Sequence, residues 1–509
     1  MPTSLLTIGL MPLCLSGAAF GAELGYRVLL ERSVETEFRP AAERLAKEHD
    51  VPIELFDPSD LRTLRDQLRA DPAREAATHV AFVVAPQTLD VQFAQDLLIA
   101  LTEVDEDPFV DVTYAFITGR SGTAALRFVE QGIAGRARPL TGNAGMFGSW
   151  EGAALPTQQP LSALKAFGFE GTQRYVKVTD PAEARAREAR EALASFAACD
   201  LTLLFSHGHP DRMEFCFSGR DLREWKASLP PSVVINCACW NGATGRWWEE
   251  GPNGPIQQAS VSPDDSVALA MLDTGCAAYI AGLDPWHGPL AMRYAFQLLD
   301  DGCTLGEAAK ETFDRLTLEF APARIRLDPV AQRGPRREGT DNRRRNSAAI
   351  VVFGDPSWAP FAARPTRLIS AKRNDAPAGQ RIEFTVKPLV EGSPGADFML
   401  PQGRIMDYHS VRTENWMKEA KLEFVRTVDW PERLPAAPVV RVVEATVRGQ
   451  ALPCGEVQAL IELTPKGRRL HVRVPINVPA MGSMWPMGIA TGGATIVLSA
   501  EAPSVEAPR

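Results

Sequence analysis

Short apolar segments with strand character alternate with amphipathic helical segments over the first two thirds of the chain. The series begins with the apolar run Tyr26–Leu30, the amphipathic run Glu35–His49 and a second apolar run, Ile53–Phe56. Strands that alternate with helices pair in parallel, because each crossover helix returns the chain to the edge where the previous strand began. The pattern continues to Ile350–Phe353, so we expect an α/β domain with a doubly wound, mostly parallel sheet covered by helices. Further strands are expected at Leu201–Phe205, Val233–Asn236 and Ala277–Ala281, and further helices at Ala182–Phe196, Asp265–Asp273, Pro289–Leu299 and Thr304–Glu319.

The pattern changes at about Thr366, where alternating β segments separated by Pro and Gly turns replace the strand and helix series. Such a texture is typical of a β-sandwich. A chain of 509 residues also exceeds what one hydrophobic core usually supports. We therefore expect an N-terminal α/β subdomain at residues 23–135, a second α/β subdomain at 136–364 and a C-terminal β-sandwich domain at 365–509.

Residues 1–22 have the features of a secretory signal peptide, apart from its basic start. They run apolar from Leu5 to Leu15 and end in small residues that suit a cleavage site, but they hold no Lys or Arg. The alternative is that they form the first buried strand of the mature domain. A signal peptide predicts a secreted, periplasmic or cell-surface protein, whereas the alternative predicts a cytoplasmic one. No other segment is apolar enough to cross a bilayer, so we expect no integral membrane segment in the mature form.

The charge and the cysteine content exclude several classes of protein. A formal net charge of −9 gives no general attraction to phosphate backbones or anionic lipids, so we expect neither nucleic acid nor a membrane surface as a partner. The eight cysteines are too sparse for a disulfide scaffold and lack the paired Cys-x-x-Cys spacing of structural zinc sites. The oligomeric state is not indicated by the sequence.

Two predicted strands end in chemically reactive side chains at the carboxyl edge of the sheet, where open α/β folds place their sites. One strand runs into His207 and Gly208, and the other runs into Cys239. A thiol is a useful nucleophile only as thiolate, so it needs a base or a cationic imidazole close by. A glycine after the histidine lets a backbone N–H approach a reacting carbonyl and donate to an oxyanion. The N–H of Cys239 is the natural second donor.

These motifs resemble those of the caspase, gingipain and legumain group of cysteine peptidases. The His207-Gly208 pair follows an apolar strand, and Ala238-Cys239 follows another strand 32 positions later, counted from the histidine to the cysteine. The sequence Ala238–Gly242 (Ala-Cys-Trp-Asn-Gly) is similar to the gingipain form in particular.

Two further segments extend the resemblance to gingipains. Val352–Ser357 (Val-Phe-Gly-Asp-Pro-Ser) is similar to the element with which gingipain catalytic domains end. Asp107–Val112 and Gly119–Ser121 resemble parts of the first gingipain subdomain. The resemblance thus runs intermittently over about residues 25–360, and the β-rich tail is similar to the immunoglobulin-like module that follows gingipain catalytic domains.

The resemblance implies a caspase-like fold and a cysteine endopeptidase whose substrates are proteins or peptides. It assigns His207 as general base, Cys239 as nucleophile, and the amides of Gly208 and Cys239 as the oxyanion hole. It also implies that Trp286 walls the substrate pocket and that Asp284 lines it. A carboxylate there favours Arg or Lys in the substrate by charge pairing; the alternative is that Asp284 caps a turn before Pro285.

Other assignments stay open at this point. The acidic residue that orients the histidine in this family corresponds best to Glu151, with Asn143 as the alternative. No cofactor enters the chemistry, and whether a structural calcium ion is required is left open.

Two other classes of protein compete with the peptidase. His207, His209, Cys237 and Cys239, with Cys216, offer the ligand types of a zinc site, although their spacings match no standard zinc motif. A peptidase-like binding module without turnover is the second alternative. As the nucleophile, Cys239 is favoured over Cys237, because a strand residue at 237 would point into the core.

Overall fold

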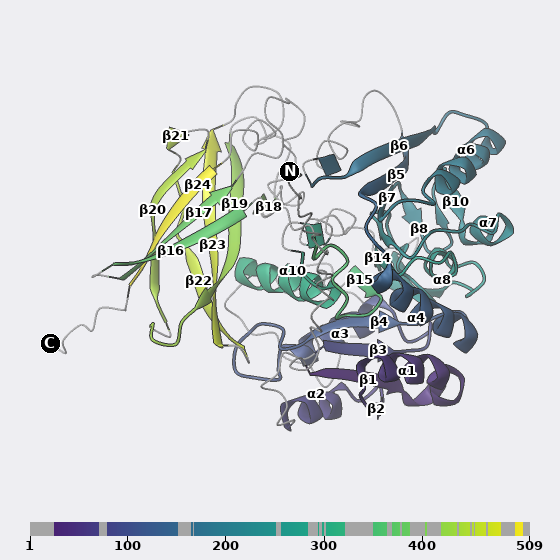
Figure 1. Ribbon diagram of the computed structural model, residues 1–509, viewed down its shortest axis with the longest axis horizontal. Coiled ribbons are helices and arrows are strands. Elements are labelled where there is room, and N and C mark those ends of the chain that lie inside the picture. Colours follow the sequence, from purple (N-terminus) through teal and green to yellow (C-terminus); the bar gives the residue numbers. More distant parts are fainter. Residues whose placement is uncertain are drawn as a thin grey trace, which may run out of the picture.

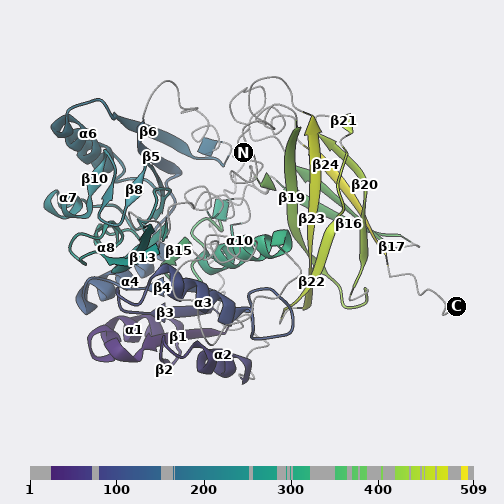
Figure 2. The ribbon, with the colours of Figure 1, turned by 180° about the vertical axis from the view of Figure 1, so that it is seen from behind.

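The chain forms an α/β body and a β-sandwich that lie side by side (Figures 1 and 2). The predicted signal peptide lies outside the residues that the structure describes. The computed structural model describes residues 25–70, 79–150, 164–165, 167–250, 256–283, 294, 298–299, 302–320, 350–363, 369–376, 379–386, 403–404, 419–434, 437–447, 450–451, 453–464, 467–479 and 494–501.

The α/β body is built on one ten-stranded sheet with the order β2-β1-β3-β4-β15-β14-β11-β7-β5-β6. The sheet contains two groups of parallel strands, β2-β1-β3-β4-β15 and β14-β11-β7-β5-β6. The two groups meet at β14 and β15, which pair in antiparallel fashion. The predicted mostly parallel α/β sheet is therefore confirmed. Its strands are β1 (Tyr26–Glu31), β2 (Ile53–Phe56), β3 (His79–Val83), β4 (Thr113–Ile117), β5 (Asn143–Trp150), β6 (Glu170–Lys177), β7 (Leu201–Phe205), β11 (Val233–Asn236), β14 (Ala278–Gly282) and β15 (Ile350–Phe353).

Helices cover both faces of this sheet, and two separate hydrophobic clusters fill the space beneath them. Phe38 and Phe128, from α1 and α4, join one cluster, while Leu305 and Ala308 of α10 join the other. Figure 1 shows α10 between the sheet and the sandwich. The helices are α1 (Glu35–His49), α2 (Leu61–Ala70), α3 (Val91–Leu101), α4 (Gly122–Ala137), α6 (Ala182–Ser195), α7 (Gly219–Glu224), α8 (Val267–Leu272) and α10 (Leu305–Phe320).

The segment after β15, which carries the Gly-Asp-Pro-Ser motif, connects four elements through one buried carboxylate. Asp355 accepts a hydrogen bond from the Tyr26 hydroxyl at 3.0 Å, pairs with His49 Nε2 at 2.8 Å and forms an ion pair with Arg136. Burial alone would raise the pKa of Asp355, but the hydrogen bond from His49 and the charge of Arg136 lower it to about 2. The motif thus joins β15 to β1, α1 and α4.

The C-terminal part is a sandwich of two antiparallel sheets, as predicted from its alternating pattern. Their facing side chains form a core that includes Phe384, Trp430 and Leu470. One sheet has the order β16-β17-β24-β20-β21 and the other β18-β19-β23-β22. The strands are β16 (Ile369–Ala376), β17 (Gly379–Val386), β18 (Gly403–Arg404), β19 (Glu419–Trp430), β20 (Val439–Val447), β21 (Gln450–Ala451), β22 (Gln458–Thr464), β23 (Gly467–Pro479) and β24 (Ala494–Glu501).

A buried network of charged groups joins the sandwich to the α/β body. Lys310 of α10 lies 2.5 Å from both Asp314 of the same helix and Glu462 of β22. Glu462 also bonds to the fully buried His471 at 2.7 Å, and Phe109 stacks on the His471 ring with centroids 4.0 Å apart. Burying charges is costly unless they are paired, and the charged groups of this network are paired with one another. The sandwich is therefore joined to the α/β body through buried polar contacts.

Candidate active site

The pairing of β7 with β11 brings the two predicted reactive residues to one edge of the sheet. The strands are parallel, and Leu204 lies opposite Asn236 as their last pair in register. The Cys237 amide continues the ladder by donating to the Leu204 carbonyl at 2.8 Å. His207 and Cys239 each stand three residues beyond that last pair, so both leave the sheet at its carboxyl edge.

Gly208 lies directly against the backbone of Cys239. A Cβ atom at position 208 would be 2.3 Å from the Cys239 carbonyl oxygen and 2.8 Å from its amide nitrogen, which no real side chain tolerates. Gly208 is buried, His207 is exposed and Cys239 is half-buried. The structure thus brings the His-Gly turn into contact with the cysteine turn and leaves the imidazole accessible. A substrate carbonyl could approach both backbone amides only at such a close contact.

An aromatic cluster that the sequence interpretation missed stands beside these turns. The hairpin of β12 (Arg246–Glu250) and β13 (Ile256–Ser260) carries Trp247, whose ring meets His209 at 4.6 Å and Trp240 at 5.3 Å, both edge-on. His209 Nδ1 also bonds to Asp211 at 2.8 Å. The signal available in the sequence was the grouping of three tryptophans, at 240, 247 and 248, directly after the cysteine.

The other cysteines near the site do not resemble nucleophiles. Cys237 packs against the hydrophobic cluster under the sheet, and burial raises the pKa of its thiol far above its usual range. Burial likewise raises the pKa of the Cys216 thiol to about 12. Both groups stay protonated near neutral pH, so neither supplies a thiolate.

The zinc interpretation gains no support from the geometry. Within the described part of the chain, the donor atoms of the five histidines and cysteines proposed for it form no group of three within 4.8 Å of one another. His209 and Cys216 instead bond to neighbouring polar groups, Asp211 and Ser206 respectively.

Three predicted site residues lie outside the described residues: Glu151, Asp284 and Trp286. Asn143, the alternative to Glu151, is the first residue of β5, and Trp150 is the last. The Trp150 end of β5 lies at the sheet edge where β7 ends, because Gly148 pairs with Phe205. Seven residues of extended strand separate the two ends by about 23 Å. Asn143 therefore lies too far from the edge at which β7 ends to orient His207.

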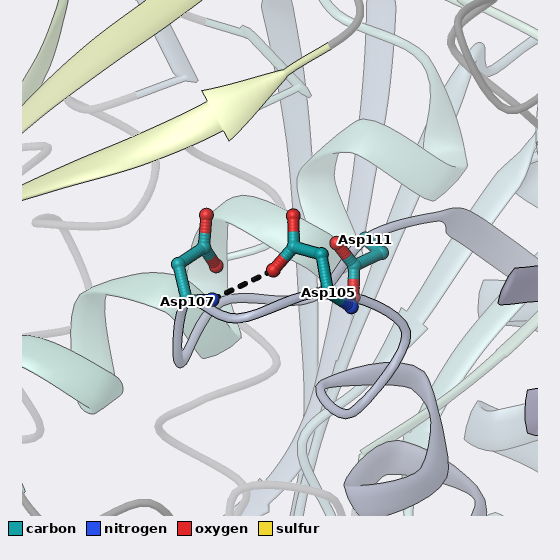
Figure 3. A group of neighbouring side chains, drawn as sticks. All are labelled: Asp105, Asp107 and Asp111. Atoms are coloured by element: carbon teal, nitrogen blue, oxygen red, sulfur yellow. Dashed lines mark hydrogen bonds between the residues drawn. The ribbon is translucent and has the colours of Figure 1, made fainter.

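A cluster of three carboxylates lies at the junction with the sandwich, away from His207 and Cys239. Ligand oxygens of Asp105, Asp107 and Asp111 lie within 4.8 Å of one another (Figure 3). Asp107 also accepts a hydrogen bond from the Leu463 amide of β22 at 2.8 Å. Carboxylate oxygens suit calcium, but three ligands are fewer than the six to eight that calcium takes. A structural calcium ion therefore stays a prediction.

The carboxylate cluster makes a prediction about pH. Burial and the charge of Asp105 raise the pKa of Asp111 to about 9, whereas a carboxyl in an unfolded chain has a pKa of about 4. Between about pH 4 and pH 9 the folded state therefore keeps the Asp111 proton that the unfolded chain loses. The stability that this proton contributes is lost as the pH rises towards 9. We expect the melting temperature in EDTA to fall between pH 5 and pH 9, and to fall by at least about 3 °C less in Asp111→Asn. An equal fall in melting temperature between pH 5 and pH 9 in the two proteins would contradict this.

The contact of Gly208 with Cys239 makes a second prediction. Gly208→Ala would force the Cys239 turn away, and we expect catalytic turnover to fall on the order of 100-fold or more, since small misplacements of reacting groups have such effects. Gly132→Ala in α4 is the matched control, because a Cβ there meets only the Ala277 carbonyl oxygen at 3.9 Å. Rates of hydrolysis and melting temperatures of both variants are the measurement. Full activity in Gly208→Ala would show that the two turns need not touch.

No helix in the described residues is long and apolar enough to cross a membrane.

Comparison with known proteins yields structural neighbours. No protein-family model matches the sequence, and no curated protein matches it. A complex of Porphyromonas gingivalis RgpB pro- and mature domains is similar with a TM-score of 0.44 and 14% identity, over 71% of this chain and 86% of that chain. A structure described as a protease has a TM-score of 0.44 and 10% identity, over 91% and 96%. The Saccharomyces cerevisiae separase–securin complex has a TM-score of 0.31 and 13% identity, over 54% and 16%.

Proposed function

We propose that this chain is a cysteine endopeptidase in which Cys239 is the nucleophile and His207 the general base. The observation that supports this most strongly is the packing of Gly208 on the Cys239 backbone, because it places two exposed or half-buried reactive residues on adjoining turns. Cys237, by contrast, packs against the hydrophobic cluster beneath the sheet. Proteins or peptides are the substrates that such a site would take.

The chemistry would be acyl transfer in two steps. His207 takes the thiol proton, and the Cys239 sulfur bonds to the scissile carbonyl carbon while the amides of Gly208 and Cys239 hold the oxyanion. The C–N bond then breaks, and His207 returns its proton to the leaving amine. A water molecule attacks the resulting thioester, which releases the acid product and restores the thiol.

Substrate preference and export are parts of the same proposal. Asp284 would pair with an Arg or Lys side chain of the substrate, and Trp286 would wall the pocket beside it, as the resemblance to gingipains implies. Glu151, which follows Trp150 in the sequence, would orient His207. Residues 1–22 would direct the protein to the periplasm, the cell surface or the medium.

A binding module without turnover is the second candidate. It would use the same edge of the sheet, with the aromatic cluster around Trp247 as its contact surface. Peptide hydrolysis by the wild-type protein distinguishes the two candidates, because only the peptidase turns over its substrate.

The decisive experiment is hydrolysis of fluorogenic peptides that end in Arg, Lys, Asn, Asp or Leu at the cleavage point, under reducing conditions, with and without calcium. We expect turnover after Arg or Lys that falls by a factor on the order of 1,000 or more in Cys239→Ala, since the nucleophile is lost. Cys237→Ala is the matched control and keeps its turnover. Absence of turnover in the wild-type protein under all conditions would favour the binding module. An equal loss of turnover in Cys239→Ala and Cys237→Ala would show that the nucleophile is wrongly assigned.

A further inference from the structure

The turn that carries Cys239 is closed at its base by two buried asparagines. Asn236 ends β11, and its Nδ2 donates to Asn241 Oδ1 at 3.0 Å across the turn. The Oδ1 atom of Asn236 accepts a hydrogen bond from the Ala238 amide at 2.9 Å. Both asparagine side chains are fully buried. Cys239 therefore sits at the tip of a six-residue loop whose two ends are bonded to each other.

Tyr279, on the neighbouring strand β14, completes this network. Its hydroxyl accepts from Asn236 Nδ2 at 3.1 Å and donates to the Asn241 carbonyl at 2.9 Å. The ring is fully buried, and burial raises the pKa of Tyr279 far above its usual range. The hydroxyl therefore keeps its proton, and remains a donor, near neutral pH.

Asn241 also reaches the other turn of the site. Its Nδ2 donates to the carbonyl oxygens of His209 at 2.6 Å and Arg212 at 3.1 Å. This fixes the orientation of the carboxamide, because both carbonyls require a donor and the opposite Oδ1 faces the Asn236 Nδ2. One side chain thus connects the loop of Cys239 with the loop that begins at His207.

The backbone of the Cys239 turn needs such support. Trp240 has φ +53°, in the left-handed region that bulky residues rarely adopt. Residues held in this region persist only where their surroundings over-determine them. The bonds on either side of Trp240 supply that constraint.

We propose that Asn236, Asn241 and Tyr279 are positioning residues that hold the Cys239 thiol in register with the His207 imidazole. The inference rests on the proposed function and deepens it. Without the network, the Cys239 turn relaxes while the sheet beneath it is kept. The thiolate then loses its imidazole partner, and the attacking sulfur loses its alignment with the oxyanion donors.

Tyr279→Phe tests this, with Tyr26→Phe as the matched control. Both changes remove one buried hydroxyl from the same sheet. The Tyr26 hydroxyl bonds to Asp355 at 3.0 Å, in a different cluster that includes Arg136 and His49. Three quantities are measured for each variant: the melting temperature, kcat and KM on the cleaved peptide, and the rate of iodoacetamide alkylation of the Cys239 peptide between pH 5 and 9, followed by mass spectrometry.

We expect both variants to lose similar thermal stability. Tyr279→Phe alone lowers kcat, roughly 10- to 100-fold with KM changed less than about 2-fold, as loss of alignment predicts. It also shifts the alkylation profile of Cys239 to higher pH, since a thiol without its imidazole returns towards its ordinary pKa of about 8.5. Asn241→Ser is a second variant, with the same expected direction, should Tyr279→Phe fail to fold.

Each outcome bears on one claim. If Tyr279→Phe matches Tyr26→Phe in kcat and in alkylation, the positioning role is wrong while the peptidase stands. If the wild-type protein cleaves no peptide, the proposed function fails, and the alkylation profiles still decide whether the network controls the state of Cys239.

Discussion

The parallel pairing of β7 with β11 is the constraint on which the candidate site depends. Because Leu204 lies opposite Asn236, the residues three places beyond each strand leave the sheet together. A slip of one residue would move Cys239 away from the His-Gly turn and reverse which side chains face the core. Gly208 then fits only because it has no Cβ, and the asparagine and tyrosine network fixes the remaining freedom of the cysteine turn.

Buried polar groups also join separate elements elsewhere in the molecule. The Asp355 cluster joins four elements of the α/β body, and the Lys310 and Glu462 ion pair joins that body to the sandwich. Asp107 and Phe109, which belong to the motif that resembles the first gingipain subdomain, contact β22 and β23 of the sandwich. Several segments that make the sequence resemble gingipains are therefore parts of the framework, whereas the His-Gly and Cys turns carry the proposed chemistry.

The sequence predicted the strands that end in the site and both structural classes, because long apolar runs and clear alternation are strong signals. Among the elements that it missed are α3, β4, α4, β5 and β6, and for α4 and β5 the miss has a physical reason. Gly135 in α4 lowers helix propensity but lets the helix pack closely on Ala277 and Trp358, and Gly145 and Gly148 in β5 make room for Phe196 and the Phe205 carbonyl. Tertiary packing overrode local preference there. The network of Asn236, Asn241 and Tyr279 was also unpredictable, since it joins the end of β11, the turn after it and the neighbouring strand β14.

The central claim is that Cys239, activated by His207, attacks a peptide carbonyl. Its most direct measurement is covalent trapping with a peptidyl acyloxymethyl ketone that ends in Arg, followed by mass spectrometry of the digested protein. The account predicts one adduct, on the peptide that contains Cys239, which is lost in His207→Ala although the protein still folds. An adduct on Cys237 or another cysteine, or labelling of Cys239 that is equally fast without the imidazole, would contradict it.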